Sequence, residues 1–238
     1  MKLVLTFISD THTKHRYCEK DLPGGDILIH AGDFMNSGRY EYEATDFLDW
    51  FEGINNYKNK IFIAGNHDRL FEHDADWRKM ILDEYKTIDY LQDEDWVDYN
   101  DGPNGEYPED NIRIYGSPWQ PEFYNWAFNL PRNGEAMKAR WDAIPDNTDI
   151  LITHGPAFGY LDIPGGQSVR VGCEMLRHRI DAFKPKMHVF GHIHGSAGYY
   201  FNGHTHFINA SILNEGYVYA NQPLTVEWDN ITNEIKWL

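Results

Sequence analysis

The chain has 238 residues, of which 42% are hydrophobic and 15% aromatic, as in folded globular proteins and unlike disordered ones. Its net charge of −16 disfavours long nucleic acids and anionic membranes as partners. The charge does not exclude a small anionic substrate, because bound metal ions can reverse its sign locally. No apolar run approaches the roughly 18 residues that a membrane-spanning helix needs.

No repeat, low-complexity tract or Gly/Ser linker divides the sequence, so residues 1–238 are predicted to form one domain. The only cysteines, Cys18 and Cys173, are too few for a disulfide framework, and no C-x-x-C motif occurs. Two free thiols are typical of a reducing compartment, and the predicted location is cytoplasmic.

Short apolar runs of strand length alternate with segments in which apolar residues recur at helical spacing. In chain order we predict strands at 2–9 and 26–30, a helix at 42–55, a strand at 60–64, a helix at 75–86, a strand at 111–115, a helix at 134–143, a strand at 149–153, a helix that ends before Pro185, and strands at 186–190, 206–209 and 224–228. This alternation indicates an α/β fold.

Two connections carry their own predictions. No helix separates the runs at 206–209 and 224–228, so these last two strands are predicted to pair antiparallel. Residues 93–110 hold eight acidic side chains and no basic one, and are predicted to form a solvated hairpin loop.

Side chains that bind metals or move protons follow five of the predicted strands. They are Asp10 and His12, then Asp33, then Asn66, His67 and Asp68, then His154, and finally His192 and His194. Ligands of open α/β sheets bind beyond the carboxyl ends of the strands, so these side chains are expected at one edge. Asp and His bind borderline divalent ions, and an Asn carbonyl is a neutral hard donor. The set therefore predicts a site for two metal ions.

The spacing within the set supports convergence. Asp10 and His12 lie two residues apart, as do His192 and His194, and such pairs project to the same side of an extended backbone. The glycines before Asp33, Asn66 and His192 allow a sharp turn and a close approach of the backbone. The other seven histidines are interpreted as core or surface residues. His204 and His206 repeat the Gly-His-x-His pattern, but they follow a polar turn instead of a buried strand.

The five motifs, in this order, resemble those of the calcineurin-like metallophosphoesterases. They are D-x-H at Asp10, GD at Gly32, GNHD at Gly65, the lone His154, and G-H-x-H at Gly191. Segments 115–121, 128–132, 149–156, 171–173 and 208–211 are further similar to the small metallophosphoesterase-domain-containing proteins first noted in brain and to their microbial relatives. Some of those brain proteins carry Gly where this chain has His192, so two full metal sites are expected here.

The resemblance implies a four-layer α/β/β/α sandwich of two mixed sheets. It assigns one metal ion to Asp10, His12, Asp33 and His194, and the second to Asp33, Asn66, His154 and His192, with Asp33 bridging. It makes His67 the catalytic histidine, held in place by Asp68. The cofactor it implies is a pair of divalent ions, and the nitrogen and oxygen ligands suit Mn²⁺, Fe or Zn²⁺.

The activity implied is a dinuclear-metal-dependent phosphoesterase, in which a hydroxide held between the two ions attacks phosphorus. The expected substrate is a small phosphodiester of the nucleotide type, including 2′,3′- or 3′,5′-cyclic ones. His67 is expected either to protonate the leaving oxygen or to stabilise charge on the phosphoryl group.

Substrate contacts are predicted from an aromatic cluster and two strand-end residues. Trp119 and Trp126 belong to a run of aromatic residues next to Arg132, which suits stacking of a nucleobase and binding of a phosphate. The alternative for each aromatic residue is a place in the core under a loop. Asn209 and Ser211 follow a strand and are predicted to line the pocket.

Three other functions remain open from the sequence. The same scaffold supports a phosphomonoesterase or protein phosphatase. A metal-dependent nuclease is disfavoured by the charge of −16 and the lack of a basic stripe. A non-enzymatic scaffold is disfavoured by the intact set of metal-binding residue types.

Overall fold

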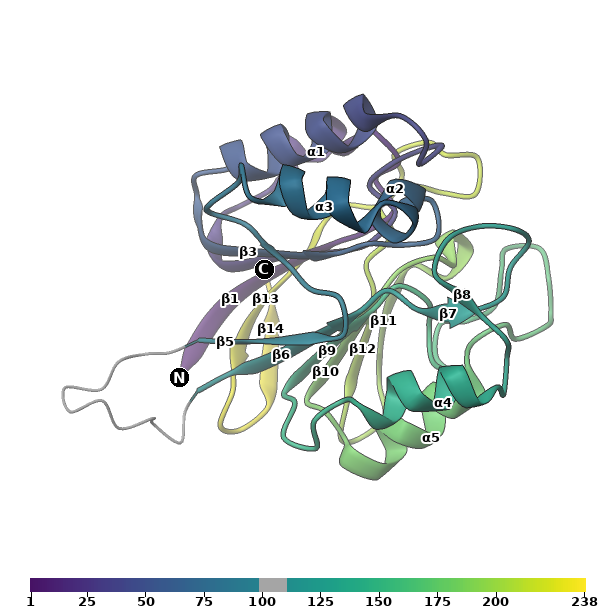
Figure 1. The fold of residues 1–238 in the computed structure, drawn as a ribbon. Helices are drawn as coiled ribbons and strands as arrows, with labels where there is room; N and C mark the ends of the chain where they lie inside the picture. The colour runs from purple at the N-terminus through teal and green to yellow at the C-terminus, as the bar shows by residue number, and fades with distance from the viewer. Residues whose placement is uncertain (99–110) are drawn as a thin grey trace.

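The computed structural model describes residues 1–98 and 111–238, and it contains two six-stranded sheets (Figure 1). The first sheet has the order β14-β13-β1-β2-β3-β4, and the second has the order β11-β12-β10-β9-β6-β5. The strands of the first sheet, in that order, are Glu234–Trp237, Leu224–Asp229, Lys2–Ile8, Gly25–Ala31, Tyr57–Ile63 and Asp89–Tyr90. Those of the second are Gly198–Phe201, His206–Asn209, Met187–Phe190, Ile150–Thr153, Arg113–Ser117 and Glu94–Val97. Each sheet contains both parallel and antiparallel pairs.

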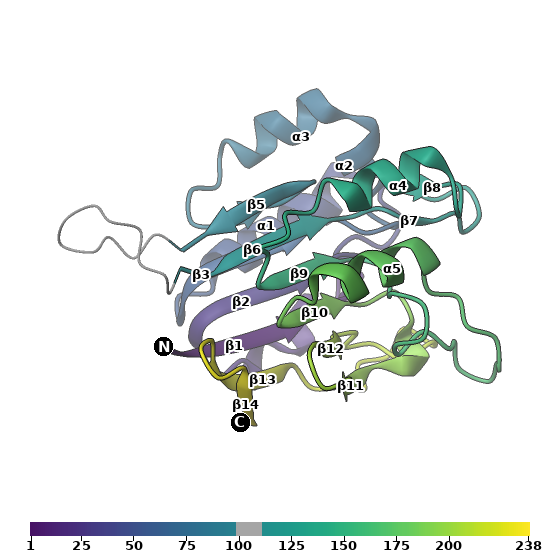
Figure 2. The ribbon, with the colours of Figure 1, turned by 90° about the horizontal axis from the view of Figure 1, so that it is seen from below.

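Helices cover the outer face of each sheet. Helices α1 (Glu41–Gly53), α2 (Arg69–His73) and α3 (Ala75–Leu82) lie on the first sheet. Helices α4 (Glu135–Asp142) and α5 (Glu174–Phe183) lie on the second, which is in front when the molecule is seen from below (Figure 2). The predicted four-layer α/β/β/α arrangement of two mixed sheets is therefore confirmed.

The two sheets bury a common core between them. Leu5 and Phe7 of β1 point into it and meet residues such as Ile152 and Val189 of the second sheet. Ile8, next along β1, instead joins the cluster under α1 to α3. A strand that is buried on both faces is apolar throughout, which explains why the sequence signals for these strands are continuous instead of alternating.

All eight predicted strands and all four predicted helices are present, with ends shifted by a few residues. The elements that the sequence did not reveal are all short. They are α2, the 3-10 helices η1 (His15–Tyr17), η2 (Glu19–Asp21) and η3 (His194–Ser196), the edge strands β4, β5, β11 and β14, and the parallel pair β7 (Gln120–Pro121) and β8 (Asn129–Leu130). Short edge strands bury little apolar surface, so their sequences carry a weak pattern.

The predicted pairing of the last two strands is wrong. β12 pairs parallel with β10 in the second sheet, whereas β13 pairs antiparallel with β1 in the first. The chain between them crosses from one sheet to the other, and Ser211 forms a bridge with Ser9 on the way. Two apolar strands without a helix between them can thus belong to different layers.

The acidic segment does not begin as a loop, because Glu94–Val97 form β5, which pairs antiparallel with β6. The predicted hairpin loop itself falls mainly on residues 99–110, which lie outside the described residues. Among the described residues, no helix is long and apolar enough to cross a bilayer.

Candidate metal centre

The side chains singled out from the sequence converge where strands of both sheets end. Asp10 follows β1, Asp33 follows β2 and Asn66 follows β3 in the first sheet. His154 follows β9, and His192 follows β10, in the second. Because the carboxyl ends of these parallel strands share one edge, residues up to 184 positions apart in the chain come into contact.

The backbone reaches this arrangement by left-handed turns, not by the extended conformation that the sequence analysis assumed. Asp10, His12, Asp33 and His192 have φ values of 55°, 41°, 58° and 67°. Non-glycine residues rarely adopt this region, although Asp, Asn and His do so more often than others. The two pairs therefore converge because the chain turns at each strand end, and the expected two-residue alternation plays no part.

Glycines permit the close approach that the motifs predicted. A Cβ atom on Gly191 would lie 2.0 Å from Oδ2 of Asp10, and one on Gly65 would lie 2.4 Å from Oδ1 of Asp33. No side chain fits at either position without displacing a carboxylate of the cluster. The expected close approach is confirmed at both glycines.

Three groups of potential metal-binding atoms overlap at this edge, each with its atoms within 4.8 Å of one another. The groups are Asp10, His12 and His194; His12, Asp33 and His67; and Asp33, His154 and His192. Asp33 and His12 each belong to two groups, so the three form one continuous cluster. Asn66 joins it through Oδ1, which is 3.0 Å from Nε2 of His154.

Hydrogen bonds fix which nitrogen each imidazole presents to the cluster. Nδ1 of His12, His154 and His194 lies 3.2, 2.9 and 3.0 Å from the backbone carbonyls of Met35, Ala31 and Asn214. A carbonyl only accepts, so each Nδ1 carries the proton and Nε2 faces inward. A second hydrogen-bond partner of this kind is typical of metal-ligating histidines.

The buried carboxylates of Asp10 and Asp33 favour positive charge on the groups beside them. Burial opposes protonation of His194, but the Asp10 carboxylate outweighs it and raises the His194 pKa to about 9. Burial likewise opposes protonation of His154, and Asp33 reverses the effect and raises the His154 pKa to about 9. The buried carboxylates thus draw positive charge to the Nε2 positions. Divalent cations between the same nitrogen and oxygen atoms would supply this charge, so the residues fit a metal centre.

Two other histidines of the cluster stay neutral. Burial lowers the pKa of His12 to about 4 and that of His192 to about 3. A neutral imidazole keeps a lone pair available for a cation. The cluster is therefore composed of two ionised carboxylates, two neutral imidazoles, and two histidines whose protonated form the neighbouring carboxylates stabilise.

The calcineurin-like phosphoesterase family matches residues 3–196. Metallophosphoesterase domain-containing protein 1 of Homo sapiens is 40% identical over 230 residues, which cover 92% of this chain and 69% of that protein. A UPF0046 protein of Caenorhabditis elegans, K07C11.7, is 34% identical and covers 93% of this chain and 74% of its own length. This chain belongs to the calcineurin-like phosphoesterase family.

A structural likeness agrees with this assignment at the level of the fold. The crystal structure of TT1561 from Thermus thermophilus superposes with a TM-score of 0.63 at 13% identity, covering 100% of this chain and 98% of that one. The family is dinuclear-metal-dependent, and the three overlapping groups in this calcineurin-like phosphoesterase provide candidate ligands for such a centre.

A buried layer of hydrogen bonds holds Asp10 in this phosphoesterase. Oγ of Ser211 donates to Oδ2 of Asp10 at 2.7 Å, and the backbone N–H of His192 is 3.0 Å from both carboxylate oxygens. Asn209 donates to the carbonyl of Ile193 at 2.9 Å. Asn209 and Ser211 are 0% and 1% exposed and are not among the residues that line the cavity beside the cluster, where the sequence analysis expected them. They act behind the cluster, where they orient Asp10 and the loop that carries His192.

The structure also corrects the role of Asp68. Its carboxylate accepts backbone N–H groups of Asp33, Met35 and Gly65 at 2.9, 2.8 and 2.7 Å. None of these bonds reaches the imidazole of His67. Asp68 therefore holds the loops after β2 and β3 together, which fixes Asp33 and not His67.

His67 has its own support. Its Nδ1–H donates to the carbonyl of Asn36 at 2.6 Å, and its ring stacks on Trp126 with centroids 4.0 Å apart. The guanidinium of Arg69 also lies over the Trp126 ring, at 4.5 Å from its centroid. Residues 66 and 67 lie in a turn, so His67 points toward His12 and Asp33, and not away from the cluster as extended backbone would require.

The remaining predicted contacts divide between the pocket and the core. A cavity of about 460 Å³ borders the cluster and is lined by His192, His194 and Arg132. Arg132 donates to the carbonyls of Val171 and Gly172 and pairs with Glu174 at 2.7 Å, so much of its hydrogen-bonding capacity is used within the protein.

Trp119 does not line this cavity. Its indole N–H donates to Asp93 at 2.8 Å, and Arg140 lies over its ring at 4.5 Å. The prediction of a substrate contact is wrong for Trp119, because the ring packs between the two helix-covered cores. Both ring nitrogens of His206 are bonded away from the cluster. Nδ1 lies 2.9 Å from the hydroxyl of Tyr199, and Nε2 lies 2.9 Å from the backbone carbonyl of Asn233.

Sequence reasoning missed Tyr217, which lies in the loop that crosses between the sheets. Its ring centroid is 4.8 Å from that of His12 and 5.4 Å from that of His194, and the residue lines the cavity beside the cluster. The segment around it has no motif and no strand pattern, so only the tertiary structure brings it to the site. A non-glycine φ of 56° at Tyr217 is the local sign of its special position.

Proposed function

We propose that this protein hydrolyses small phosphodiesters of the nucleotide type with two divalent metal ions bound. The observation that carries the proposal is the overlap of three groups of metal-binding atoms through Asp33 and His12 at one sheet edge. Two ions that share a carboxylate suit in-line displacement at phosphorus, because they stabilise both the attacking and the leaving oxygen.

The proposed ligand sets combine the groups in the structure through Asp33, which lies with His12 in one group and with His154 and His192 in another. Asp10, His12, Asp33 and His194 would hold one ion. Asp33, Asn66, His154 and His192 would hold the other. Mn²⁺, Fe and Zn²⁺ suit this mixture of imidazole and oxygen donors. When bound, the ions supply positive charge for the phosphate and an activated water.

The residues of the chain contribute position and a proton. With Nδ1 of His67 committed to the carbonyl of Asn36, Nε2 is the nitrogen that is free to give a proton to the leaving oxygen. Stacking on Trp126 fixes the plane of the ring. The backbone N–H of His67 donates to Oδ1 of Asp33 at 2.7 Å, so the position of His67 is tied to the shared carboxylate.

The size and charge of the site support a small substrate. The adjoining cavity of about 460 Å³ offers the ring of Phe123, which lies 5.8 Å from that of His192, together with Gln120 and Tyr217. An aromatic wall beside a phosphate site suits a nucleobase. The net charge of −16 disfavours a long nucleic acid, and a phosphomonoester is the second candidate substrate for the same centre.

We also propose a cytoplasmic location. Cys18 and Cys173 are both buried and unpaired. Burial raises the pKa of each thiol, which keeps both in the unreactive protonated form.

Metal removal is expected to abolish hydrolysis of bis(p-nitrophenyl) phosphate, and added Mn²⁺ is expected to restore it. The reason is that the chain offers no Ser nucleophile motif or acid–base pair that would replace the ions. The measurement is the rate of nitrophenolate release after dialysis against a chelator, with p-nitrophenyl phosphate as the matched monoester. Undiminished activity in protein shown by elemental analysis to be metal-free would refute the proposal, and a faster monoester would select the second candidate.

His192→Gly is expected to keep one tightly bound ion and to lose or loosen the second. His192 belongs to the group with Asp33 and His154, whereas the group of Asp10, His12 and His194 stays intact. Diesterase activity should fall strongly, because one ion does not stabilise both the attacking and the leaving oxygen. The measurement is metal stoichiometry together with rate, with His204→Gly at an exposed position as the control. Two retained ions and most of the rate would exclude His192 as a ligand.

A further inference from the structure

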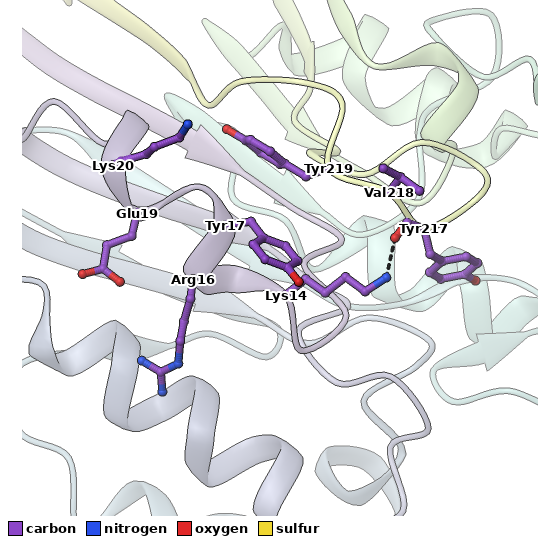
Figure 3. Close-up of a pocket in the computed structure, with 8 residues that line it drawn as sticks. All are labelled: Lys14, Arg16, Tyr17, Glu19, Lys20, Tyr217, Val218 and Tyr219. Atoms are coloured by element: carbon purple, nitrogen blue, oxygen red, sulfur yellow. Dashed lines mark hydrogen bonds between the residues drawn. The ribbon is translucent and has the colours of Figure 1, made fainter.

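A second, open cavity of about 930 Å³ lies beside the metal centre and was not expected from the sequence. Figure 3 shows three tyrosines and three basic residues around it: Lys14, Arg16, Tyr17, Lys20, Tyr217 and Tyr219. Most of this wall comes from the segment that directly follows His12, and the rest comes from the loop that crosses between the sheets. We call it the Lys14–Tyr219 groove.

The groove is joined to the metal centre through Tyr217. This residue lines both the groove and the cavity that holds His192 and His194. The ammonium group of Lys14 donates to the carbonyl of Tyr217, which ties the two walls together at the boundary. A ligand with its phosphate at the cluster thus has the groove as its neighbouring space.

The local charge of the groove is opposite to that of the whole chain. Glu19 is its single acidic lining residue, and the side chain of Glu19 accepts from the indole of Trp50 at 3.3 Å and points away from the tyrosines (Figure 3). Arg16 also points away and pairs with Asp46 at 2.6 Å. Lys14 and Lys20 therefore supply the positive charge of the groove, one at each end (Figure 3), and the nearby carboxylate of Asp21 accepts the hydroxyl of Tyr219.

The rings of Tyr17 and Tyr219 in the groove differ in their support and in their exposure to solvent. The hydroxyl of Tyr219 donates to Asp21 at 2.6 Å, which fixes the ring. Tyr17 is 60% exposed and covers little of the protein itself. Lys20 is exposed and has no recorded ion-pair partner within residues 1–98 and 111–238. Figure 3 shows the two rings between the ammonium groups of Lys14 and Lys20, which suits a nucleobase with an anion at the Lys20 end.

We propose that the Lys14–Tyr219 groove binds the nucleoside end of the substrate and that this end carries a second phosphate group. The inference rests on the proposed function, because it takes the phosphodiester to be bound at the metal centre. It names the substrate class more closely as a nucleotide diester with an additional terminal phosphate, such as a 5′-phosphorylated dinucleotide. Lys20 binds the second phosphate at the end of the groove away from Tyr217, and Tyr17 and Tyr219 flank the base.

The test compares two chromogenic esters that differ only in the second phosphate. They are the p-nitrophenyl ester of thymidine 5′-monophosphate and the same ester with a 3′-phosphate, both assayed with the Mn²⁺-loaded protein. We expect the 3′-phosphorylated ester to have a KM about 10-fold lower, since a charged hydrogen bond contributes roughly the free energy of a tenfold change. Equal KM values for the two esters in the unaltered protein would overturn the proposal.

Charge variants of Lys20 locate the effect. Lys20→Gln is expected to reduce the KM preference about 3-fold or more. Lys20→Glu, which reverses the charge, should remove the preference. Lys79→Gln and Lys79→Glu, on the exposed face of α3, change the net charge by the same amounts and should leave the preference intact. A preference that survives Lys20→Glu, or that the Lys79 changes remove equally, would refute the groove as the binding site.

Binding measured without hydrolysis separates this inference from the proposed function. Calorimetric titration with thymidine 3′,5′-bisphosphate is expected to show weaker binding to Lys20→Glu by about 10-fold, and unchanged binding to Lys79→Glu. If neither ester is hydrolysed but this difference is found, the proposed diesterase function fails and the anion-binding groove stands. If both esters are hydrolysed and binding is equal in all variants, the groove fails and the diesterase function stands.

Discussion

Asp33→Ala is expected to cost the protein both metal ions and nearly all of its phosphodiesterase activity. Oδ2 of Asp33 lies 3.2 Å from Nε2 of His154 and 3.8 Å from Nε2 of His12, so one carboxylate connects the two halves of the cluster. No other residue belongs to both proposed ligand sets. The rate should fall by about 10²–10³-fold or more, as when a preorganised charge is removed from an active site.

The substitution should also disturb the position of His67, because the Asp33 carboxylate accepts the backbone N–H of His67 at 2.7 Å. Asp33→Asn preserves the shape and that hydrogen bond but removes the charge, so it separates the two effects. Elemental analysis measures the ions, and circular dichroism shows whether the variant is folded. Near-normal content of two ions in folded Asp33→Ala protein would contradict the bridging role.

His67→Ala is expected to separate metal binding from chemistry. The two proposed ligand sets are complete without His67, although the structure places it within 4.8 Å of atoms of His12 and Asp33. Metal content should therefore survive the change. Hydrolysis of diesters with poor alkoxide leaving groups should slow by about 10²–10⁴-fold if His67 protonates the leaving oxygen.

Nitrophenyl diesters provide the comparison, because nitrophenolate leaves without protonation and its release should slow less. His178→Ala, at an exposed position of α5, is the matched control for loss of an imidazole. Equal losses on both kinds of diester would assign His67 to charge stabilisation instead. Unchanged rates on both would remove His67 from the mechanism, and loss of an ion would make it a ligand.

The strands of the core could be predicted because each is buried on both faces. Burial on both faces demands an almost continuous apolar run, as in β9 and β10, and such a run is visible in any sequence. The polar residues after these runs stand out for the same reason, since Asp or His directly after a buried strand has no structural need to be there. The sequence alone therefore identified the elements that carry the cluster and the residue types within it.

Features that depend on which elements meet could not be predicted in this way. β12 and β13 have similar apolar patterns but belong to different sheets, because the segment between them crosses over at Ser211. Trp119 and Trp126 belong to one aromatic run. The indole of Trp119 donates to Asp93, whereas the ring of Trp126 stacks on His67. Local sequence does not specify which ring faces the site.

The sequence by itself determined the buried core strands, the order of the motifs and the set of side chains available to a metal centre, because these follow from local burial and residue chemistry. Only the tertiary structure decided that Ser211 supports Asp10, that Asp68 fixes Asp33, and that Tyr217 joins the centre to a second cavity. Each of these contacts links segments that are distant along the chain. They arise because two sheets stack with their strand ends aligned, and no local pattern encodes that alignment.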